Sequence, residues 1–255
     1  MDVLVCIKRV PLSGGKFTIT EDGLDIESAK LGFTISPHEE VAVEEAVRIV
    51  EQAGSGSVTV LTLGPTEAEE QIREQMAIGA DRGILIETDG QEWDPQGTAS
   101  AIADAITADE TDFDLIIMGN ESADASGYQT GIRVAHKLGR PVVTGVKGIA
   151  IGGGPDHTAT FERPVKAGRE IYEVPLPAVV TVLDGLNVPR YPSVPGRIRA
   201  KKKPIERLTP ERPEPKLEKT KLEVPATEAK HAQVLGNDPE AAPAVVEIFK
   251  QIGVI

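Results

Sequence analysis

The segment 114–130 combines residue types that suit the binding of a phosphate. It opens with an apolar run at 115–118, which is too short for a helix and is typical of a buried strand. The run ends at Gly119, and small or hydroxyl-bearing residues follow before a helical pattern begins at Thr130. Small side chains let a phosphate approach the backbone, and the unpaired N–H groups at a helix start attract an anion. Taken alone, the segment is better explained as an ordinary strand-to-helix turn, so the case for binding depends on the rest of the chain.

Apolar runs elsewhere predict the sheet that positions this segment. Buried strands are expected at 3–7, 58–63, 83–86, 115–118 and 177–182, and helical patterns separate the first four. Strands that alternate with helices at this spacing predict an α/β fold with a doubly wound, Rossmann-like parallel sheet. From 142 to 174, short stretches alternate apolar and polar residues around glycine-rich turns. This pattern predicts antiparallel strands at one edge of the sheet.

The start of the first long helix is marked at 36–39. Ser36 suits the capping position, Pro37 suits the first helical position, and Glu39 can close a capping box. Because this helix follows the first strand, its start is expected at the same edge of the sheet as the 119–130 loop.

Four segments are therefore expected to line one cleft. In an open α/β sheet, ligands bind beyond the carboxyl ends of the strands. Those ends are residues 6–8, 63–65 and 119–121, and the helix start at Ser36 joins them. We predict a nucleotide site here, with phosphate at 126–130 and adenine between Cys6 and Leu63.

The chain changes character after about residue 185. Residues 1–185 are expected to form the α/β domain, and 201–255 an extended C-terminal arm that ends in a short helix. Residues 204–240 are rich in Pro, Glu and Lys and carry too few apolar side chains for a core of their own. A single amphipathic helix behind such an arm is marginal in water. We therefore expect the arm to lie on another subunit.

Composition excludes several classes of function. A formal net charge of −13 over 255 residues argues against binding to nucleic acid or to an anionic membrane surface. The single cysteine, Cys6, allows no internal disulfide and is interpreted as a buried core thiol. No apolar segment approaches the length of a membrane span, so we expect a cytoplasmic protein without direct membrane insertion.

Catalytic groups are scarce in the sequence. The four histidines (His38, His136, His157 and His231) are scattered, so no metal site is predicted. No nucleophile elbow, Cys-x-x-Cys pair or Gly-Lys-Ser/Thr phosphate loop occurs. A nucleotide cleft without acid–base machinery indicates binding rather than turnover, so we do not expect an enzyme.

Seven short motifs, in order along nearly the whole chain, carry a resemblance to a known family. They are KRV at 8–10, AVEEAVR at 42–48, AIGADRG at 77–83, QTG at 129–131, LPAVVT at 176–181, NVPRY at 187–191 and AKKK at 200–203. Together they resemble the β subunit of electron transfer flavoproteins, whose fold is adenine nucleotide hydrolase-like.

The resemblance implies a heterodimer with an α subunit and one redox-active FAD that is bound chiefly by that partner. Such a pair takes electrons from dehydrogenases, such as the acyl-CoA dehydrogenases of fatty acid β-oxidation, and passes them toward a quinone oxidoreductase. The β subunit holds a structural AMP. The positions that match the family's AMP site are Cys6, Ser36, Pro37, His38, Glu39, Leu63, Gly119, Asn120, Ser122, Ala123, Asp124, Ser126, Gly127, Tyr128, Gln129 and Thr130. Residues 186–200 resemble the family's partner-recognition loop, with docking residues Pro189, Arg190, Tyr191 and Val194.

Two alternatives stay open at this point. The loop before Gln129 is smaller and less acidic than is usual in the family, and such a loop accommodates a diphosphate. Some electron-bifurcating relatives hold a second FAD in the β subunit at this place, although the QTG motif resembles the AMP type. A stand-alone ATP-binding regulator of the stress-protein type is the other alternative. That family has a second glycine close behind the position of Gly119 and lacks a long arm.

Overall fold

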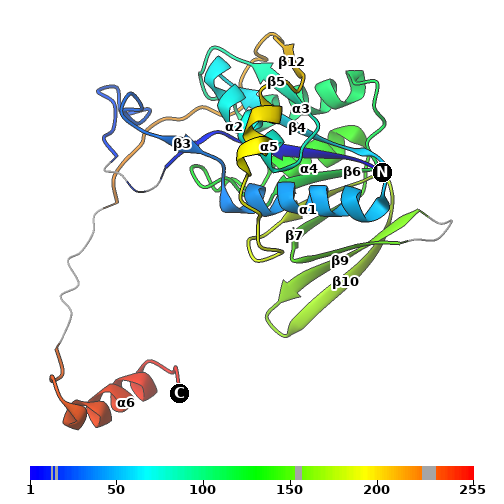
Figure 1. Cartoon of the computed structure of the whole chain (residues 1–255). Helices are drawn as coiled ribbons and strands as arrows, with labels where there is room; N and C mark the ends of the chain where they lie inside the picture. Colours follow the sequence, from blue (N-terminus) through cyan, green and yellow to red (C-terminus); the bar gives the residue numbers. More distant parts are fainter. Residues whose placement is uncertain (13, 15–16, 153–156, 226–233) are drawn as a thin grey trace. The chain divides into compact units, whose positions relative to one another are not determined.

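The computed structural model describes residues 1–12, 14, 17–152, 157–225 and 234–255. The chain divides into two compact units, Met1–Thr220 and Lys221–Ile255 (Figure 1). His231 and the rest of residues 226–233, which belong to the predicted arm, lie outside the described residues. In the part of the chain that is described, no helix is both long and apolar enough to cross a membrane.

The first unit is built on a seven-stranded sheet whose neighbouring strands all run parallel. This architecture confirms the predicted doubly wound fold. The strands, in spatial order, are β12 (Ile205–Leu208), β5 (Arg82–Glu87), β4 (Ser57–Gly64), β1 (Asp2–Ile7), β6 (Leu115–Gly119), β11 (Ala178–Val182) and β7 (Val142–Val146). The order reverses at β1, because the chain passes from β1 to β4 on one side and later returns to β6 on the other.

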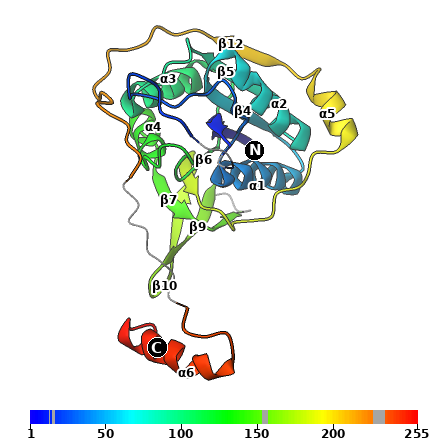
Figure 2. The ribbon, with the colours of Figure 1, turned by 90° about the vertical axis from the view of Figure 1, so that its left-hand side faces the viewer.

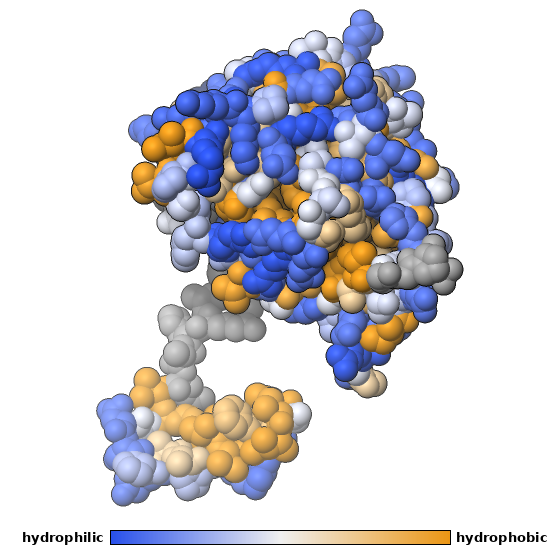
Figure 3. All heavy atoms as spheres, turned by 45° about the vertical axis from the view of Figure 1, so that its right-hand side comes forward, coloured by the Kyte–Doolittle hydropathy of each residue, from blue (hydrophilic) through white to orange (hydrophobic). Residues whose placement is uncertain are grey.

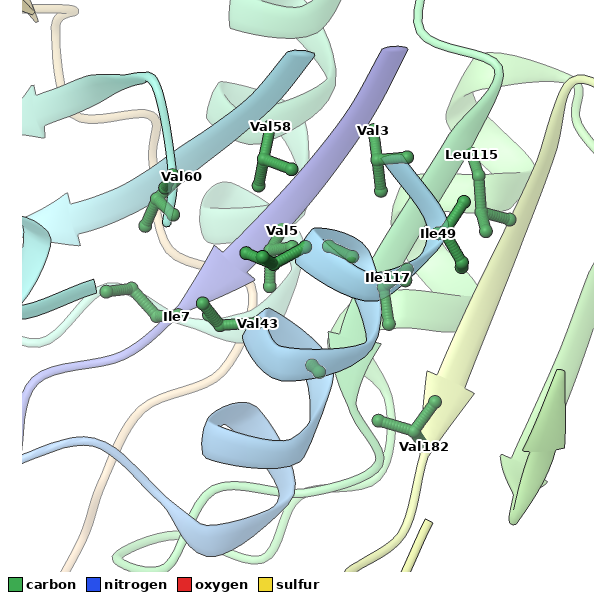
Figure 4. Close-up of a cluster of buried hydrophobic side chains, with 14 of the residues drawn as sticks. Val3, Val5, Ile7, Val43, Ile49, Val58, Val60, Leu115, Ile117 and Val182 are labelled. Atoms are coloured by element: carbon green, nitrogen blue, oxygen red, sulfur yellow. The ribbon is translucent and has the colours of Figure 1, made fainter. Parts of the chain in front are cut away.

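Helices cover both faces of this sheet, so its central strands are buried on two sides (Figure 2). Alternate residues of β1 show the division, since Val3, Val5 and Ile7 belong to one buried cluster while Leu4 and Cys6 belong to the other. Figure 4 shows the first cluster, in which side chains of β1, β4 and β6 pack against the first helix. The helices of this unit are α1 (Pro37–Ala53) and α2 (Glu69–Ile78) on one face, α3 (Pro95–Ala108) and α4 (Thr130–Leu138) on the other, the short α5 (Val194–Ala200), and a 3-10 turn at Thr66–Ala68.

The predicted antiparallel strands are present and form a sheet of their own. This sheet has the order β10 (Gly168–Pro175), β9 (Thr158–Val165) and β8 (Gly148–Ile151). A two-stranded ribbon, β2 (Val10–Pro11) with β3 (Phe33–Thr34), lies after β1. Residues 142–146, where the sequence pattern changes, do not belong to this sheet but form a strand of the parallel sheet. Helix α4 returns the chain to the end of the sheet at which the strands begin, so β7 runs parallel to its neighbour β11.

The C-terminal arm begins later than its composition predicted. Residues Ile205–Leu208 form β12, which pairs in parallel with β5 at the sheet edge. The chain beyond β12 stays attached to the first unit, because the N–H groups of Lys216 and Leu217 donate to Asp94 Oδ2 at 2.6 and 3.1 Å. The Lys219 ammonium also lies 2.6 Å from a carboxylate oxygen of Glu92. Residues 204–220 therefore belong to the α/β unit.

The second unit contains a 3-10 turn at Pro239–Ala241 and helix α6 (Ala242–Gln251). None of the described residues of α6 is buried. Apolar side chains gather over this helix in Figure 3, and Val246, Phe249 and Ile252 are exposed. The helix carries an apolar surface without the core that would normally cover one.

Replacing Ile117 by alanine is expected to destabilise the α/β unit strongly. Ile117 is fully buried at the centre of β6, so the truncation leaves a cavity between the sheet and α1. A loss of about 2–5 kcal/mol in the free energy of unfolding is expected for such a change. Chemical denaturation of the two proteins measures this loss. Ile171→Ala, on an exposed face of β10, is the matched control and should change stability by less than about 1 kcal/mol; equal losses would contradict the assigned core.

Candidate functional site

The carboxyl ends of β1, β4 and β6 lie together at one edge of the sheet, as predicted, because the three strands are parallel neighbours. The start of α1 comes to the same place. A Cβ atom at Gly119, the last residue of β6, would lie 3.0 Å from Glu39 Cγ and 3.3 Å from His38 Cβ. The absence of a side chain at Gly119 is therefore what lets the strand end and the helix start approach this closely.

A buried carboxylate joins these segments. Glu39 Oε1 accepts a hydrogen bond from the N–H of Lys8 at 3.0 Å, and its Oε2 accepts one from the N–H of Ser36 at 3.0 Å. The second bond is the Glu39 half of the predicted capping box. Ser36 Oγ in turn accepts a hydrogen bond from the N–H of Ala123 at 3.0 Å. One connected set of bonds thus holds the end of β1, the start of α1 and the loop after β6.

The charge on Glu39 is sensitive to pH near neutrality. Burial raises the pKa of this carboxyl from 4.5 to about 8, and the hydrogen bonds from the Ser36 and Lys8 N–H groups offset only part of the effect.

The pKa of Asp124 shifts in the opposite direction. Burial also acts to raise its pKa, but the Lys8 ammonium, 2.6 Å away, outweighs burial and holds the pKa below its usual value.

The loop between β6 and α4 has an unusual backbone and leaves the start of α4 without a side-chain cap. Ser126 and Tyr128 have φ angles of 45° and 55°, a left-handed conformation that is uncommon for residues with side chains. Gln129 precedes α4 but does not cap it with its side chain, whose Oε1 instead accepts a hydrogen bond from Arg133 Nε at 3.0 Å. The first N–H groups of α4 therefore remain available to a ligand, as the sequence predicted for a phosphate.

The start of α4 is held firmly against the sheet. A Cβ atom at Gly131 would lie 2.6 Å from Thr181 Cγ2, so α4 begins in direct contact with β11. At the beginning of the loop, the N–H of Asn120 donates to Val182 O at 2.9 Å, and its Oδ1 accepts from Thr181 Oγ1 at 2.7 Å. The loop is thus fixed at both ends while its middle, 124–128, is more exposed.

Cys6 and Leu63 lie on one face of adjacent strands, where the sequence placed the adenine. Both belong to the cluster on the α3 and α4 side of the sheet, with Cys6 buried and Leu63 partly buried. Burial, aided by the negative charge of Glu39, raises the pKa of the Cys6 thiol to about 12. The prediction of a buried core thiol is confirmed, since Cys6 is buried within the core of the sheet.

The structure adds side chains to the site that the sequence reasoning did not single out. Lys8 is the main addition, since its ammonium lies 2.6 Å from Asp124 and 3.8 Å from Glu92. A basic residue placed directly after a strand that ends at the site is a signal that could have identified it. Glu92 and its partner Lys219 carry no such signal, because their contact joins segments far apart in the sequence.

The predicted docking residues lie away from this cluster. Tyr191 and Val194 are strongly exposed, and Val194 begins helix α5 rather than lying in a loop. Pro189 precedes Arg190, whose side chain turns inward onto α1.

Among the described residues, no three His, Cys, Asp or Glu side chains gather in a way that could hold a metal ion. Backbone N–H groups and the Lys8 ammonium are suited to an anion. Leu63 is the partly exposed apolar side chain beside them, whereas Cys6 is buried in the core.

Comparison with known proteins identifies relatives over most of the chain. The family model described as the electron transfer flavoprotein domain matches residues 23–213. The chain is similar to the electron transfer flavoprotein subunit beta of Syntrophomonas wolfei, with 33% identity over 250 residues that cover 98% of this chain and 96% of the relative. It is also similar to the subunit beta of Bacillus subtilis, 34% identical over 98% of both chains, and to the mitochondrial subunit beta of Arabidopsis thaliana, 35% identical over 82% of both.

Replacing Glu39 by glutamine is expected to change how stability depends on pH. Between about pH 4.5 and 8 the native carboxyl keeps a proton that the unfolded chain has lost, so the free energy of unfolding falls as pH rises. One such proton corresponds to a slope of about 1.4 kcal/mol per pH unit. Glutamine does not titrate, so the variant should lose this contribution.

Denaturant unfolding at several pH values across this range measures the slope. Glu110→Gln, at an exposed glutamate, is the control and should keep the wild-type slope. An unchanged slope in Glu39→Gln would contradict the assigned protonation of the buried carboxyl.

Proposed function

Because the chain belongs to the electron transfer flavoprotein family, we propose that it is the β subunit of a heterodimer that carries electrons between other redox proteins. In this proposal, an α subunit supplies most of the site for FAD, which provides the redox chemistry when bound. Electrons come from dehydrogenases, such as acyl-CoA dehydrogenases, and leave toward a quinone oxidoreductase. The chain itself is a non-enzymatic carrier subunit of the cytoplasm.

We further propose that this subunit binds a structural AMP at the edge where β1, β4, α1 and the 119–130 loop meet. The observation that carries the proposal is the start of α4, where free N–H groups follow a loop that is fixed to Ser36 through Ala123. Lys8 offers a positive charge beside this loop, and Cys6 and Leu63 provide an apolar surface for the base. The residues present therefore fit an adenine nucleotide with a phosphate at one end.

A second FAD at the same place is the competing function. The residues around 123–127 are small, and most are exposed, so the loop leaves room beside α4 for a second phosphate. This feature favours a dinucleotide only if the loop keeps its conformation when the α subunit is present.

Counting the nucleotides released from the purified αβ complex distinguishes these functions. Denaturation of the complex, followed by chromatography of the released nucleotides, should give one FAD and one AMP per heterodimer. Two FAD and no AMP would contradict the AMP proposal in favour of a bifurcating subunit. A chain that purifies alone and binds ATP tightly would contradict membership of a heterodimer.

A matched pair of lysine variants tests whether the counted AMP is bound beside Lys8. Lys8→Met removes the ammonium beside the loop and should lower the AMP content without lowering the FAD content. Lys137→Met is the control, because Lys137 is similarly exposed and also pairs with an aspartate, Asp104 at 2.8 Å, but lies at the far end of α4. Equal AMP content in both variants would place the phosphate away from Lys8.

Removing residues 221–255 is expected to weaken association with the α subunit. We propose that the apolar surface of α6 packs on that subunit, because none of its described residues is buried within this chain. The first unit should remain folded, since the cut falls at the boundary between the two compact units. Co-purification with the α subunit measures association, and thermal unfolding measures folding.

A longer deletion, from residue 204, is the control for this experiment. It also removes β12, which pairs with β5, and should lower the melting temperature. Undiminished co-purification of the shorter deletion would contradict the proposed role of α6.

A further inference from the structure

The segment 187–193 is bound to the side of α1 by polar contacts that the proposed function does not explain. At its start, Asn187 Nδ2 donates to Val41 O at 2.9 Å and to Glu45 Oε2 at 2.8 Å. At its end, Ser193 caps α5 by accepting a hydrogen bond from the N–H of Gly196 at 3.1 Å. Between these two points, one side chain makes the remaining contacts with α1.

That side chain is Arg190. Its Nε and Nη2 donate to the two oxygens of Glu44 at 2.9 and 3.1 Å, and its backbone N–H donates to Glu44 Oε2 at 3.1 Å. Its Nη1 and Nη2 also donate to Glu51 at 2.8 and 3.0 Å. Only an arginine can satisfy two carboxylates at once with a planar fork.

Because Glu44 is buried, its carboxylate depends on the hydrogen bonds and positive charge that Arg190 supplies. The Glu44 side chain is 2% exposed, and a carboxylate in such a place needs compensating donors. Burial acts to raise the pKa of Glu44, but hydrogen bonds from Arg190 and Arg48 outweigh it and hold the pKa below its usual value. The carboxylates of Glu51 and Glu44 also raise the pKa of Arg190, so both partners stay charged. The ion pair therefore fixes the position of the backbone at residue 190.

The residues on either side of Arg190 point the other way. Val188 is 80% exposed, Tyr191 is 96% exposed and Val194 is 71% exposed. Large apolar side chains of this kind normally find some cover, whereas here they extend from a backbone that is anchored at Asn187, Arg190 and α5. Helix α5 is itself fixed, because Arg73 Nη1 donates to Ala200 O at 2.7 Å. A surface held in this way loses little conformational entropy when a partner covers it.

We propose that Arg190 is a positioning residue, which through Glu44 and Glu51 locks the 187–193 segment so that Tyr191 and Val194 are presented to the redox partner. The inference rests on the proposed function, since it takes the partner to be the protein that donates electrons. It gives Arg190 a role within the chain, distinct from that of the exposed side chains beside it. The exposed apolar side chains at 191 and 194 suit an apolar pocket on that partner.

Hydrogen exchange of the αβ complex tests the lock without any redox partner. Arg190→Gln should increase the amide exchange rate of residue 190 by about tenfold or more, because this N–H donates to Glu44 and the anchoring ion pairs are lost. Arg190→Lys should give a smaller increase than Arg190→Gln. Lysine keeps a positive charge beside Glu44, although its ammonium cannot bridge both carboxylates. Arg48→Ala is the matched control, because Arg48 contacts the same Glu44, at 2.7 Å, without touching the segment. Unchanged exchange in Arg190→Gln, or an equal increase in Arg48→Ala, would overturn the proposal.

A second variant covers the case in which Arg190→Gln does not fold. Glu51→Gln removes only the exposed half of the pairing, because the Glu51 side chain is 57% exposed and Glu44 stays in place. It should increase exchange of the residue-190 amide by a few-fold and leave the melting temperature nearly unchanged. No increase in this variant would overturn the proposed contribution of Glu51.

Electron transfer from an acyl-CoA dehydrogenase, reduced by its acyl-CoA substrate, tests presentation to a partner. Arg190→Gln should raise the KM for the αβ complex by about tenfold and leave kcat nearly unchanged, because only docking is weakened. Val194→Ala should also raise KM. The double variant should be little worse than Arg190→Gln alone, since Val194 contributes only when the segment is held in place. Fully multiplicative effects would overturn the coupling between Arg190 and Val194. A Val194→Ala complex with wild-type kinetics would instead contradict the proposed docking function, while the exchange result would still decide the lock.

Discussion

The Glu39 carboxyl group accepts one backbone hydrogen bond from the end of β1 and one from the start of α1, and it does so while buried. β1 ends at Ile7 and α1 begins at Pro37, and the described residues between them make only short strand pairings. Glu39 is therefore the contact that ties the start of α1 directly to the end of β1, in addition to the core packing of the helix. Ser36 extends the same set of bonds to the loop after β6. The nucleotide site depends on this junction, because it brings together segments from three separate parts of the chain.

Helix α1 connects this junction with the second functional surface. Its first turn carries Glu39, and its later turns carry Glu44 and Glu51, which hold Arg190. The apolar face of the same helix packs on the central strands, as Figure 4 shows for Val43 and Ile49. One well-buried helix therefore supports both the proposed AMP site and the proposed docking segment. Rigid support of this kind keeps the geometry of a binding site defined.

Much of this architecture follows from local sequence patterns, and the exceptions have physical reasons. The runs at 3–7 and 115–118 are continuously apolar, and 58–63 is interrupted only by the buried Thr59 and Thr62, because these strands are covered on both faces; the sequence therefore predicted them well. Strand β12 was missed because it lies at an edge, where its two central residues, Glu206 and Arg207, face solvent. The strand ends and helix start at the site were predicted from topology alone. The contacts that hold them were not, because Ala123 bonds to a residue 87 positions away and Arg190 to one 146 positions away. Such pairings depend on the folded arrangement and leave no periodic signal.

The most direct test of the account is an experimental structure of the αβ complex as purified, with its bound nucleotides retained. The account predicts an adenine nucleotide in this chain, with its phosphate in hydrogen-bonding distance of the first N–H groups of α4 and its base beside Cys6 and Leu63. It also predicts that Glu39 still joins Lys8 to Ser36 beneath the nucleotide. A nucleotide bound elsewhere in the chain, or a sheet edge covered by the α subunit with no nucleotide there, would contradict it.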